Sequence, residues 1–174
     1  MSHINIEIKA KCFHPEKVEA FLLANGARYI GLDHQKDTYF HMPSGRLKLR
    51  QGNIENSLIF YNRPDASGPK QSDFLLCAVA DGPAQEALLA KALGVKVVVE
   101  KHRKIFFIDN IKFHIDEVPG LGAFVEIEAG NIHNPSLTIE QLREQCHYYM
   151  QAFNIQEADL AERSYSDMLL ERSS

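Results

Sequence analysis

The sequence predicts an α+β domain in which an antiparallel sheet carries helices on its outer face. Segments with strand periodicity follow one another closely enough to pair as hairpins, and four segments with helical spacing separate or follow them. The 174 residues suffice for one domain with a good core, so we expect a single domain over residues 1–174.

The first half of the chain reads as strands interrupted by one helix. The helix has Pro15 in its first turn and ends near Gly26, a residue type typical of helix C-termini. The turn at 43–45 and the loop at 64–69 are rich in turn-forming residues, so each is expected to join two antiparallel strands. The segments expected to be extended are 4–11, 28–32, 37–41, 46–50, 57–63 and 72–79.

The second half begins with a helix after Asp81-Gly82-Pro83 that ends at Gly94. This helix should place Leu88, Leu89, Ala92 and Leu93 on one side. An extended segment at 96–100 and three strands follow, at 101–109, 112–118 and 123–130. Asp109-Asn110 forms a tight turn between two of them, and 119–122 a wider one. Two helices, at about 138–153 and 158–170, complete the predicted domain.

Composition excludes several classes of protein. A net charge of −4 with a pI near 6.1 argues against a surface that grips nucleic acid as a whole, but permits a locally cationic pocket. Cys12, Cys77 and Cys146 form no CxxC pair, so we expect free thiols in a reducing compartment. No apolar run approaches the roughly 18 to 20 residues that spanning requires. We therefore expect a soluble cytoplasmic protein without nucleic-acid or membrane partners.

On several predicted strands every second residue is charged or polar, while the residues between them are apolar. Because alternate residues of a strand face the same side, these charges are expected to form one common surface. Cations and carboxylates come from separate strands, an arrangement suited to a polyanion held together with a divalent metal. The residues concerned are Asn5, Glu7, Lys9, Lys11, Arg46, Lys48, Arg50, Lys101, Arg103, Lys112, His114, Asp116, Glu126 and Glu128.

Seven or eight antiparallel strands can either close into a barrel or remain an open sheet. Closure would turn the charged face inward, where each unpaired ion costs several kcal/mol unless it is paired, hydrated or bound to a ligand. An open sheet would leave the same face in water. The pattern of residues alone leaves both arrangements open.

The same residues resemble the signature of the CYTH family, the triphosphate tunnel metalloenzymes. Glu7-Ile8-Lys9 is similar to the end of its N-terminal ExExK mark. Lys48 with Arg50, and Lys101 with Arg103, resemble its paired basic strands. Residues 113–128, with Asp116, Glu126 and Glu128, resemble its late hairpin, and Arg163-Ser164-Tyr165 its C-terminal helix, above all in class IV adenylyl cyclases. The resemblance spans nearly the whole chain.

The resemblance implies a closed eight-stranded antiparallel barrel, with helices packed outside, that binds a linear triphosphate lengthwise. It implies Mg²⁺ or Mn²⁺ as cofactor, held by Glu7, Glu126 and Glu128. It assigns catalytic roles to Lys9, Arg103 and Asp116, of which Asp116 either orients a cation or binds metal. The phosphate-binding residues that it implies are Lys9, Lys48, Arg50, Arg63, Lys70, Lys101, Arg103 and Arg163.

Two positions depart from the family pattern. Asn5 replaces the first Glu of ExExK, which keeps an oxygen ligand but removes a charge and puts a second metal site in doubt. The position expected to hold a tunnel lysine reads Asn62-Arg63, so Arg63 takes this role, with Lys70 on the following loop as a substitute. His114 deserves separate notice because it shares the parity of Asp116.

The resemblance implies an enzyme that acts on a small triphosphate, and three functions follow from it. The first is a class IV adenylyl cyclase, which converts ATP to cyclic AMP and pyrophosphate. The second is a triphosphatase acting on tripolyphosphate, thiamine triphosphate or a nucleoside triphosphate. The third, suggested by Asn5, is a module that binds nucleotide or polyphosphate without turnover. A homodimer through the outer helices is compatible with each.

Overall fold

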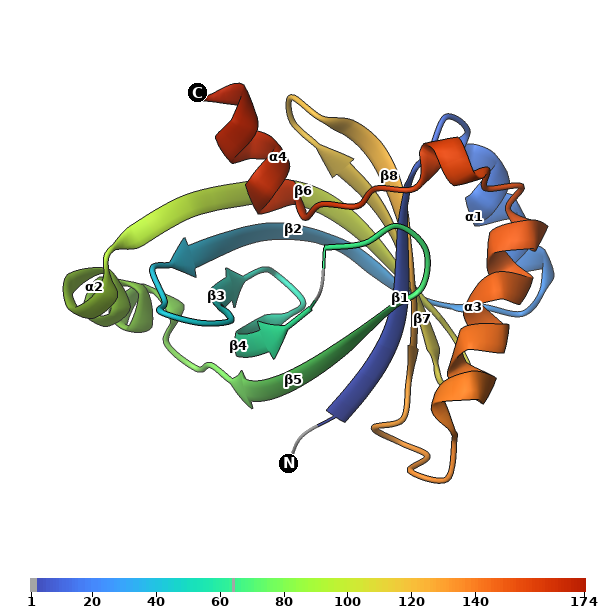
Figure 1. Cartoon of the computed structure of the whole chain (residues 1–174), viewed down its shortest axis with the longest axis horizontal. Helices are drawn as coiled ribbons and strands as arrows, with labels where there is room; N and C mark the ends of the chain where they lie inside the picture. The colour runs from blue at the N-terminus through green and yellow to red at the C-terminus, as the bar shows by residue number, and fades with distance from the viewer. Residues whose placement is uncertain (1–2, 64) are drawn as a thin grey trace.

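Eight antiparallel strands form a closed barrel in the computed structural model, which describes residues 3–63 and 65–174. The first residue of the predicted 64–69 loop, Pro64, lies outside the described residues. The order of strands around the barrel is β1-β5-β4-β3-β2-β6-β7-β8. The strands are β1 (His3–Lys11), β2 (Arg28–Phe40), β3 (Arg46–Gln51), β4 (Asn56–Asn62), β5 (Lys70–Ala78), β6 (Val95–Ile108), β7 (Ile111–Val118) and β8 (Gly122–Gly130). The predicted barrel is therefore confirmed (Figure 1).

The barrel has two ends, which we call lower and upper from their places in Figure 1. The lower end is where β1 begins and β8 ends, and it includes the loop 52–55 and the turn 109–110. The upper end includes the β7–β8 turn and the segment 160–165, which pairs with β1 through an Ala10–Leu160 bridge.

The helices lie outside the barrel, as predicted. They are α1 (Pro15–Ala24), α2 (Gly82–Leu93), α3 (Ile139–Ala152) and α4 (Tyr165–Arg172), with a 3₁₀ turn at Glu157–Asp159. In Figure 1 α1 and α3 lie on one side of the barrel and α2 on the other. A large core joins α1 and α3 to the outward residues of β1, β7 and β8. It includes Ile6 of β1, Phe113 of β7 and Leu142 of α3. Burying each such side chain contributes roughly 1.5–3 kcal/mol.

Three observed elements differ in extent from the predicted ones. The extended segments 28–32 and 37–41 belong to one long strand, β2, and 96–100 continues into the next segment as β6. The helix expected at 158–170 begins only at Tyr165, because the preceding residues run along the barrel and Ala161 N–H donates to the carbonyl of Lys9 at 2.9 Å.

Helix α2 forms where predicted but covers the barrel less completely. Leu88 is 66% exposed, and none of the helix residues is fully buried. Leu89 and Ala90 make its apolar contact, against a core of Phe40, Leu49 and Val79. Among the described residues, none of the helices combines the length and apolarity needed to cross a membrane.

Candidate functional site

A cavity of about 450 Å³ runs inside the barrel from the lower-end loop to the C-terminal segment at the upper end. We call it the central cavity. The inward-facing residues of the strands line this cavity, because the alternate, outward-facing residues pack into the apolar core. Its basic residues are Lys9, Lys48, Arg50, Arg63, Lys101, Arg103 and Lys112. Its carboxylates are Glu7, Asp37, Glu55, Asp109, Glu126 and Glu128.

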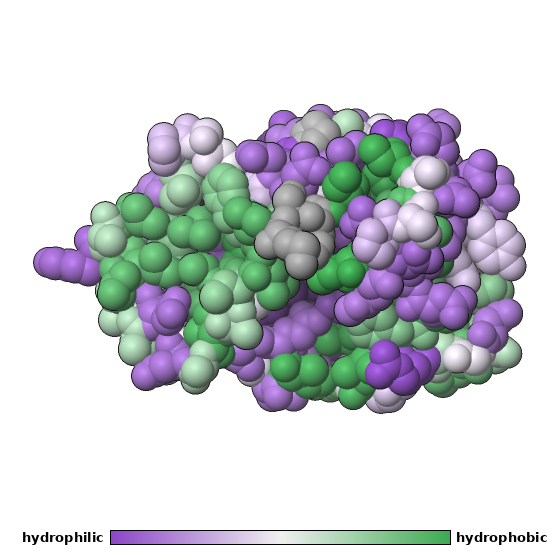
Figure 2. All heavy atoms as spheres, turned by 90° about the horizontal axis from the view of Figure 1, so that it is seen from below, coloured by the Kyte–Doolittle hydropathy of each residue, from purple (hydrophilic) through white to green (hydrophobic). Residues whose placement is uncertain are grey.

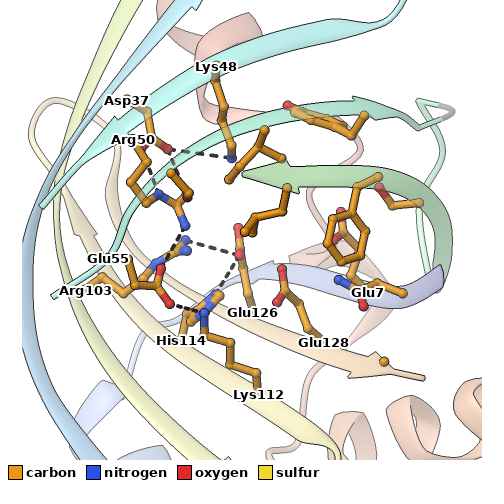
Figure 3. Close-up of a pocket in the computed structure, with 18 of the residues that line it drawn as sticks. Glu7, Asp37, Lys48, Arg50, Glu55, Arg103, Lys112, His114, Glu126 and Glu128 are labelled. Atoms are coloured by element: carbon orange, nitrogen blue, oxygen red, sulfur yellow. Dashed lines mark hydrogen bonds and ion pairs between the residues drawn. The ribbon is translucent and has the colours of Figure 1, made fainter. Parts of the chain in front are cut away.

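Asp37 on β2 organises one group of cations. Arg50 donates to both its oxygens at 2.9 Å, and Lys101 donates at 2.8 Å. Lys48 lies 3.7 Å from the same carboxylate (Figure 3). Burial raises the pKa of Asp37, but the charges of Arg50 and Lys101 outweigh it and hold this pKa well below its usual value. Asp37 is therefore ionised and fixes three cations at the cavity wall.

Arg103 is held by a second buried carboxylate. Its guanidinium donates to the two oxygens of Asp116 at 2.7 and 2.6 Å, the planar fork that arginine forms with carboxylates. Tyr165 donates its hydroxyl proton to Asp116 at 2.8 Å. Asp116 is 1% exposed and does not line the central cavity. It therefore orients Arg103 from behind, which is one of the two roles expected for it.

Glu126 on β8 lies among three nitrogen groups. Lys9 is 3.1 Å from it, Arg103 is 3.2 Å away, and the Nδ1 atom of His114 is 3.0 Å away (Figure 3). Burial, followed by the charge of Arg103, lowers the pKa of His114 to about 3, so its imidazole is neutral at physiological pH. Its Nε2 atom is buried and has no hydrogen-bond partner among the described residues.

The carboxylates beside Glu126 leave room for a cation. Glu7 pairs with Arg63, whereas Glu128 makes no hydrogen bond or ion pair within residues 3–63 and 65–174. Burial, and then the charge of Glu7, raise the pKa of Glu128 to about 7. Ligand atoms of His114, Glu126 and Glu128 lie within 4.8 Å of one another. This cluster of carboxylate oxygens offers the ligands that a divalent cation prefers, and His114 could add a nitrogen ligand.

Most of the residues predicted for the site line the central cavity. They are Glu7, Lys9, Lys48, Arg50, Arg63, Lys101, Arg103, Glu126 and Glu128. Asn5 also lines it, at the lower end.

Two predicted phosphate ligands lie outside it. Lys70 donates to the carbonyls of Ala161 and Glu162, and Arg163 is about half exposed and paired with Glu171. Both line a second, smaller hollow, which shares Glu7, Lys9, Arg63 and Glu126 with the central cavity. The C-terminal segment draws them away from the cavity, which sequence spacing could not reveal.

Sequence reasoning missed several residues that line the cavity. Asp37 lies in a segment where both parities are polar, so alternation gave no signal there. Glu55 lies in a loop, to which strand parity does not apply. Lys112 was recognised as an inward charge but received no role, although it directly faces Glu128 across the β7–β8 pair. Tyr165 was named only as part of the C-terminal helix signature and received no role in the site. It packs against Phe124, and its hydroxyl donates to Asp116.

Comparison with known proteins identifies relatives of this arrangement. The family model of the CYTH domain matches residues 3–165. A protein of Methanocaldococcus jannaschii, named as a candidate adenylate cyclase, is 26% identical, with 95% of this chain and 98% of that protein covered.

Solved structures share the fold at lower identity. A Pyrococcus horikoshii protein has a TM-score of 0.76 at 23% identity, covering 94% of this chain and 98% of its own. A candidate adenylate cyclase of Vibrio parahaemolyticus has a TM-score of 0.78 at 17% identity, covering 96% and 98%. A Hippeastrum protein, described as a candidate adenylyl cyclase with a dominant triphosphatase activity, has a TM-score of 0.59 at 13% identity, covering 98% and 95%.

Proposed function

The chain belongs to the CYTH domain family, and from that premise we propose that it is a cytoplasmic enzyme that converts ATP to cyclic AMP and pyrophosphate. The observation that carries this proposal is the convergence of basic side chains from several strands on one cavity that also holds a cluster of carboxylates. A linear triphosphate presents several negative charges in a row, which such a cavity can neutralise along its length. The three free thiols suit a reducing compartment.

Each residue has a proposed part in this reaction. Lys48, Arg50, Lys101 and Arg63 bind phosphate oxygens, and Asp37 holds the first three in place. Arg103, oriented by Asp116, is directed at the charge that develops as the ribose 3′-oxygen attacks the α-phosphorus and pyrophosphate leaves. Lys9 contacts the phosphate chain from β1. Mg²⁺ or Mn²⁺, when bound by Glu7, Glu126 and Glu128, would supply charge neutralisation to the phosphates.

Triphosphate hydrolysis is the second candidate. It requires the same cationic residues, and the dominant triphosphatase activity of the Hippeastrum protein favours it. The third candidate, binding without turnover, is favoured by Asn5, which lines the cavity where the family pattern has a carboxylate.

One experiment distinguishes these candidates. The purified protein is incubated with ATP, and separately with tripolyphosphate, in Mg²⁺ and in Mn²⁺, and the products are resolved by ion-exchange chromatography. Cyclic AMP with pyrophosphate supports the cyclase and orthophosphate supports the triphosphatase. Metal-dependent binding without product supports a sensor.

The variant Glu126→Ala should abolish turnover in either enzyme, because it removes a proposed metal ligand and the partner of Lys9. Lys91→Ala, on the exposed surface of α2, is the matched control and should retain activity. Full activity of Glu126→Ala in Mg²⁺ would show that the metal assignment is wrong.

A further inference from the structure

A carboxylate that the proposed function does not use, Glu55, lies at the lower end of the central cavity. It pairs with Lys112, and Arg50 donates to it through Nη1 at 3.0 Å (Figure 3). Gln35 donates to it at 3.2 Å. Although burial raises the pKa of Glu55, the charges of Lys112 and Arg50 hold that pKa far below its usual value. Glu55 therefore places a fixed negative charge beside both cations at this end.

The loop that carries Glu55 is itself held in place. Asp33, which is fully buried, accepts the backbone N–H groups of Ile54 at 2.9 Å and Glu55 at 3.0 Å. Gly52 allows this close approach, because a Cβ at that position would lie 2.5 Å from the Asp33 carboxylate. Asn53 adds bonds to the backbone of His34 and Leu32. Burying the Asp33 carboxylate costs free energy, and its hydrogen bonds to the loop offset that cost. The fold therefore fixes the position of Glu55.

The two ends of the cavity consequently differ in which carboxylates offset their cations. Lys9 and Arg63 line it from the strand ends nearer the upper end, where each contacts a proposed metal ligand. At the lower end Glu55 offsets Arg50 and Lys112, and Asp109 adds a further carboxylate to the lining. A phosphate extending toward the lower end would meet Glu55 at close range in a partly buried setting, where like charges repel strongly.

The lower end also offers apolar contact. Leu76 and Ile132 line the cavity there and are 54% and 45% exposed, and Phe107 lines it from the end of β6. The amide side chains of Asn56 and Asn110 lie in the same lining. Figure 2, which views this end, shows a hydrophilic hollow flanked by hydrophobic surfaces. Apolar walls with a few polar groups are typical of sites for uncharged organic rings.

We propose that Glu55 determines specificity: it makes the lower end reject a further phosphate and accept the uncharged organic group of an organic triphosphate. The inference rests on the proposed function, because it assumes that the central cavity binds triphosphates. It assigns the phosphate chain to the cations from Arg50 upward and the organic group to the end lined by Leu76, Phe107 and Ile132.

Isothermal titration in Mg²⁺ at low temperature tests the charge filter, with linear tripolyphosphate and tetrapolyphosphate as ligands. Wild type should bind tetrapolyphosphate no more tightly than tripolyphosphate. Glu55→Gln keeps the shape of the side chain and should tighten tetrapolyphosphate binding by about tenfold or more, with less than about threefold change for tripolyphosphate. Glu117→Gln, an exposed position on β7, is the matched control and should change neither affinity.

A second variant tests the organic subsite with ATP and tripolyphosphate. Leu76→Ser should weaken ATP binding by about threefold or more and leave tripolyphosphate binding unchanged, since it removes apolar contact only. Equal effects of Glu55→Gln on both polyphosphates, or of Leu76→Ser on both of its ligands, would overturn the inference while leaving the proposed function standing. If wild type bound no triphosphate at all, the proposed function would fail and the inference with it.

Discussion

Asp37 contacts three cations of the central cavity, and this sharing has a consequence for Lys101. One carboxylate cannot fully compensate Arg50, Lys48 and Lys101 together. Burial lowers the pKa of Lys101 to about 7. The charge of Asp37 opposes this shift only in part, and the charges of Arg50 and Arg103 add to it. Lys101 thus exchanges a proton near physiological pH.

Triphosphate binding should raise the pKa of Lys101, because the ligand adds negative charge beside the ammonium group. At pH 8, above its pKa, Lys101 is mostly neutral and should take up a proton on binding. At pH 6 it is already charged and should take up none. Titration calorimetry in buffers of different ionisation enthalpy measures this uptake, and Lys101→Met should reduce it at pH 8 by up to about one proton.

The control for this experiment is Lys91→Met on the surface of α2, which should leave proton uptake unchanged at both pH values. If Lys101→Met and wild type took up equal numbers of protons at pH 8, Lys101 would have to be charged before the ligand arrives.

The inward-facing residues of β1 could be predicted from the sequence, whereas those of β2 could not. Glu7 and Lys9 were recognisable because they alternate with Ile6 and Ile8, which are apolar and outward-facing. Asp33, Gln35 and Asp37 were not, because His34 and Lys36 on the outer face are polar as well. Where the outer face of a barrel with a polar interior is exposed to water, both faces of the strand are polar, so the sequence shows no alternation of apolar and polar residues. This is why β2 was expected as two separate extended segments.

Among the elements, α3 was predicted almost to the residue because its N-terminus carries a local signal. Thr138 accepts the backbone N–H of Gln141 at 3.2 Å, and the Gln141 side chain accepts the N–H of Thr138 at 2.9 Å, which is a capping box. The start of α4 has a similar signal in Ser164 and Asp167. The 160–164 segment before it is set by pairing with β1, a contact between distant parts of the chain.

The variant Thr138→Ala should lower the free energy of unfolding by about 1 kcal/mol, because it removes the cap and leaves backbone donors of the first turn without partners. Urea denaturation measures this change. Glu144→Ala, an exposed substitution in the same helix, should change stability by less than about 0.5 kcal/mol. Because α3 packs outside the barrel, Thr138→Ala should retain triphosphate binding, and loss of binding in folded protein would contradict that separation.

At the scale of the whole molecule, closure of the sheet could not be predicted from the pattern of residues. Alternation is the same for an open sheet with a wet charged face and for a barrel. The closing pairs, β1 with β5 and β1 with β8, join segments about 65 and 120 residues apart. Closure is stable because most of the enclosed charges are paired, as in the sharing of Asp37 and in the Arg103–Asp116 fork.

The balance of charge inside the barrel leads to a prediction about ligand removal. Within the described part of the chain, seven basic residues and six carboxylates line the central cavity, so a polyanion entering alone meets Glu7, Glu126 and Glu128 as well as the cations. With Mg²⁺, tripolyphosphate at 100 times its dissociation constant should raise the free energy of unfolding by about 2.7 kcal/mol. The same concentration in EDTA should give less stabilisation, because the three carboxylates then repel the phosphates. Urea denaturation at constant ionic strength, with orthophosphate as control, measures both. Equal stabilisation with and without metal would mean that the cations alone set affinity and that these carboxylates serve only to pair Lys9, Arg63 and Arg103.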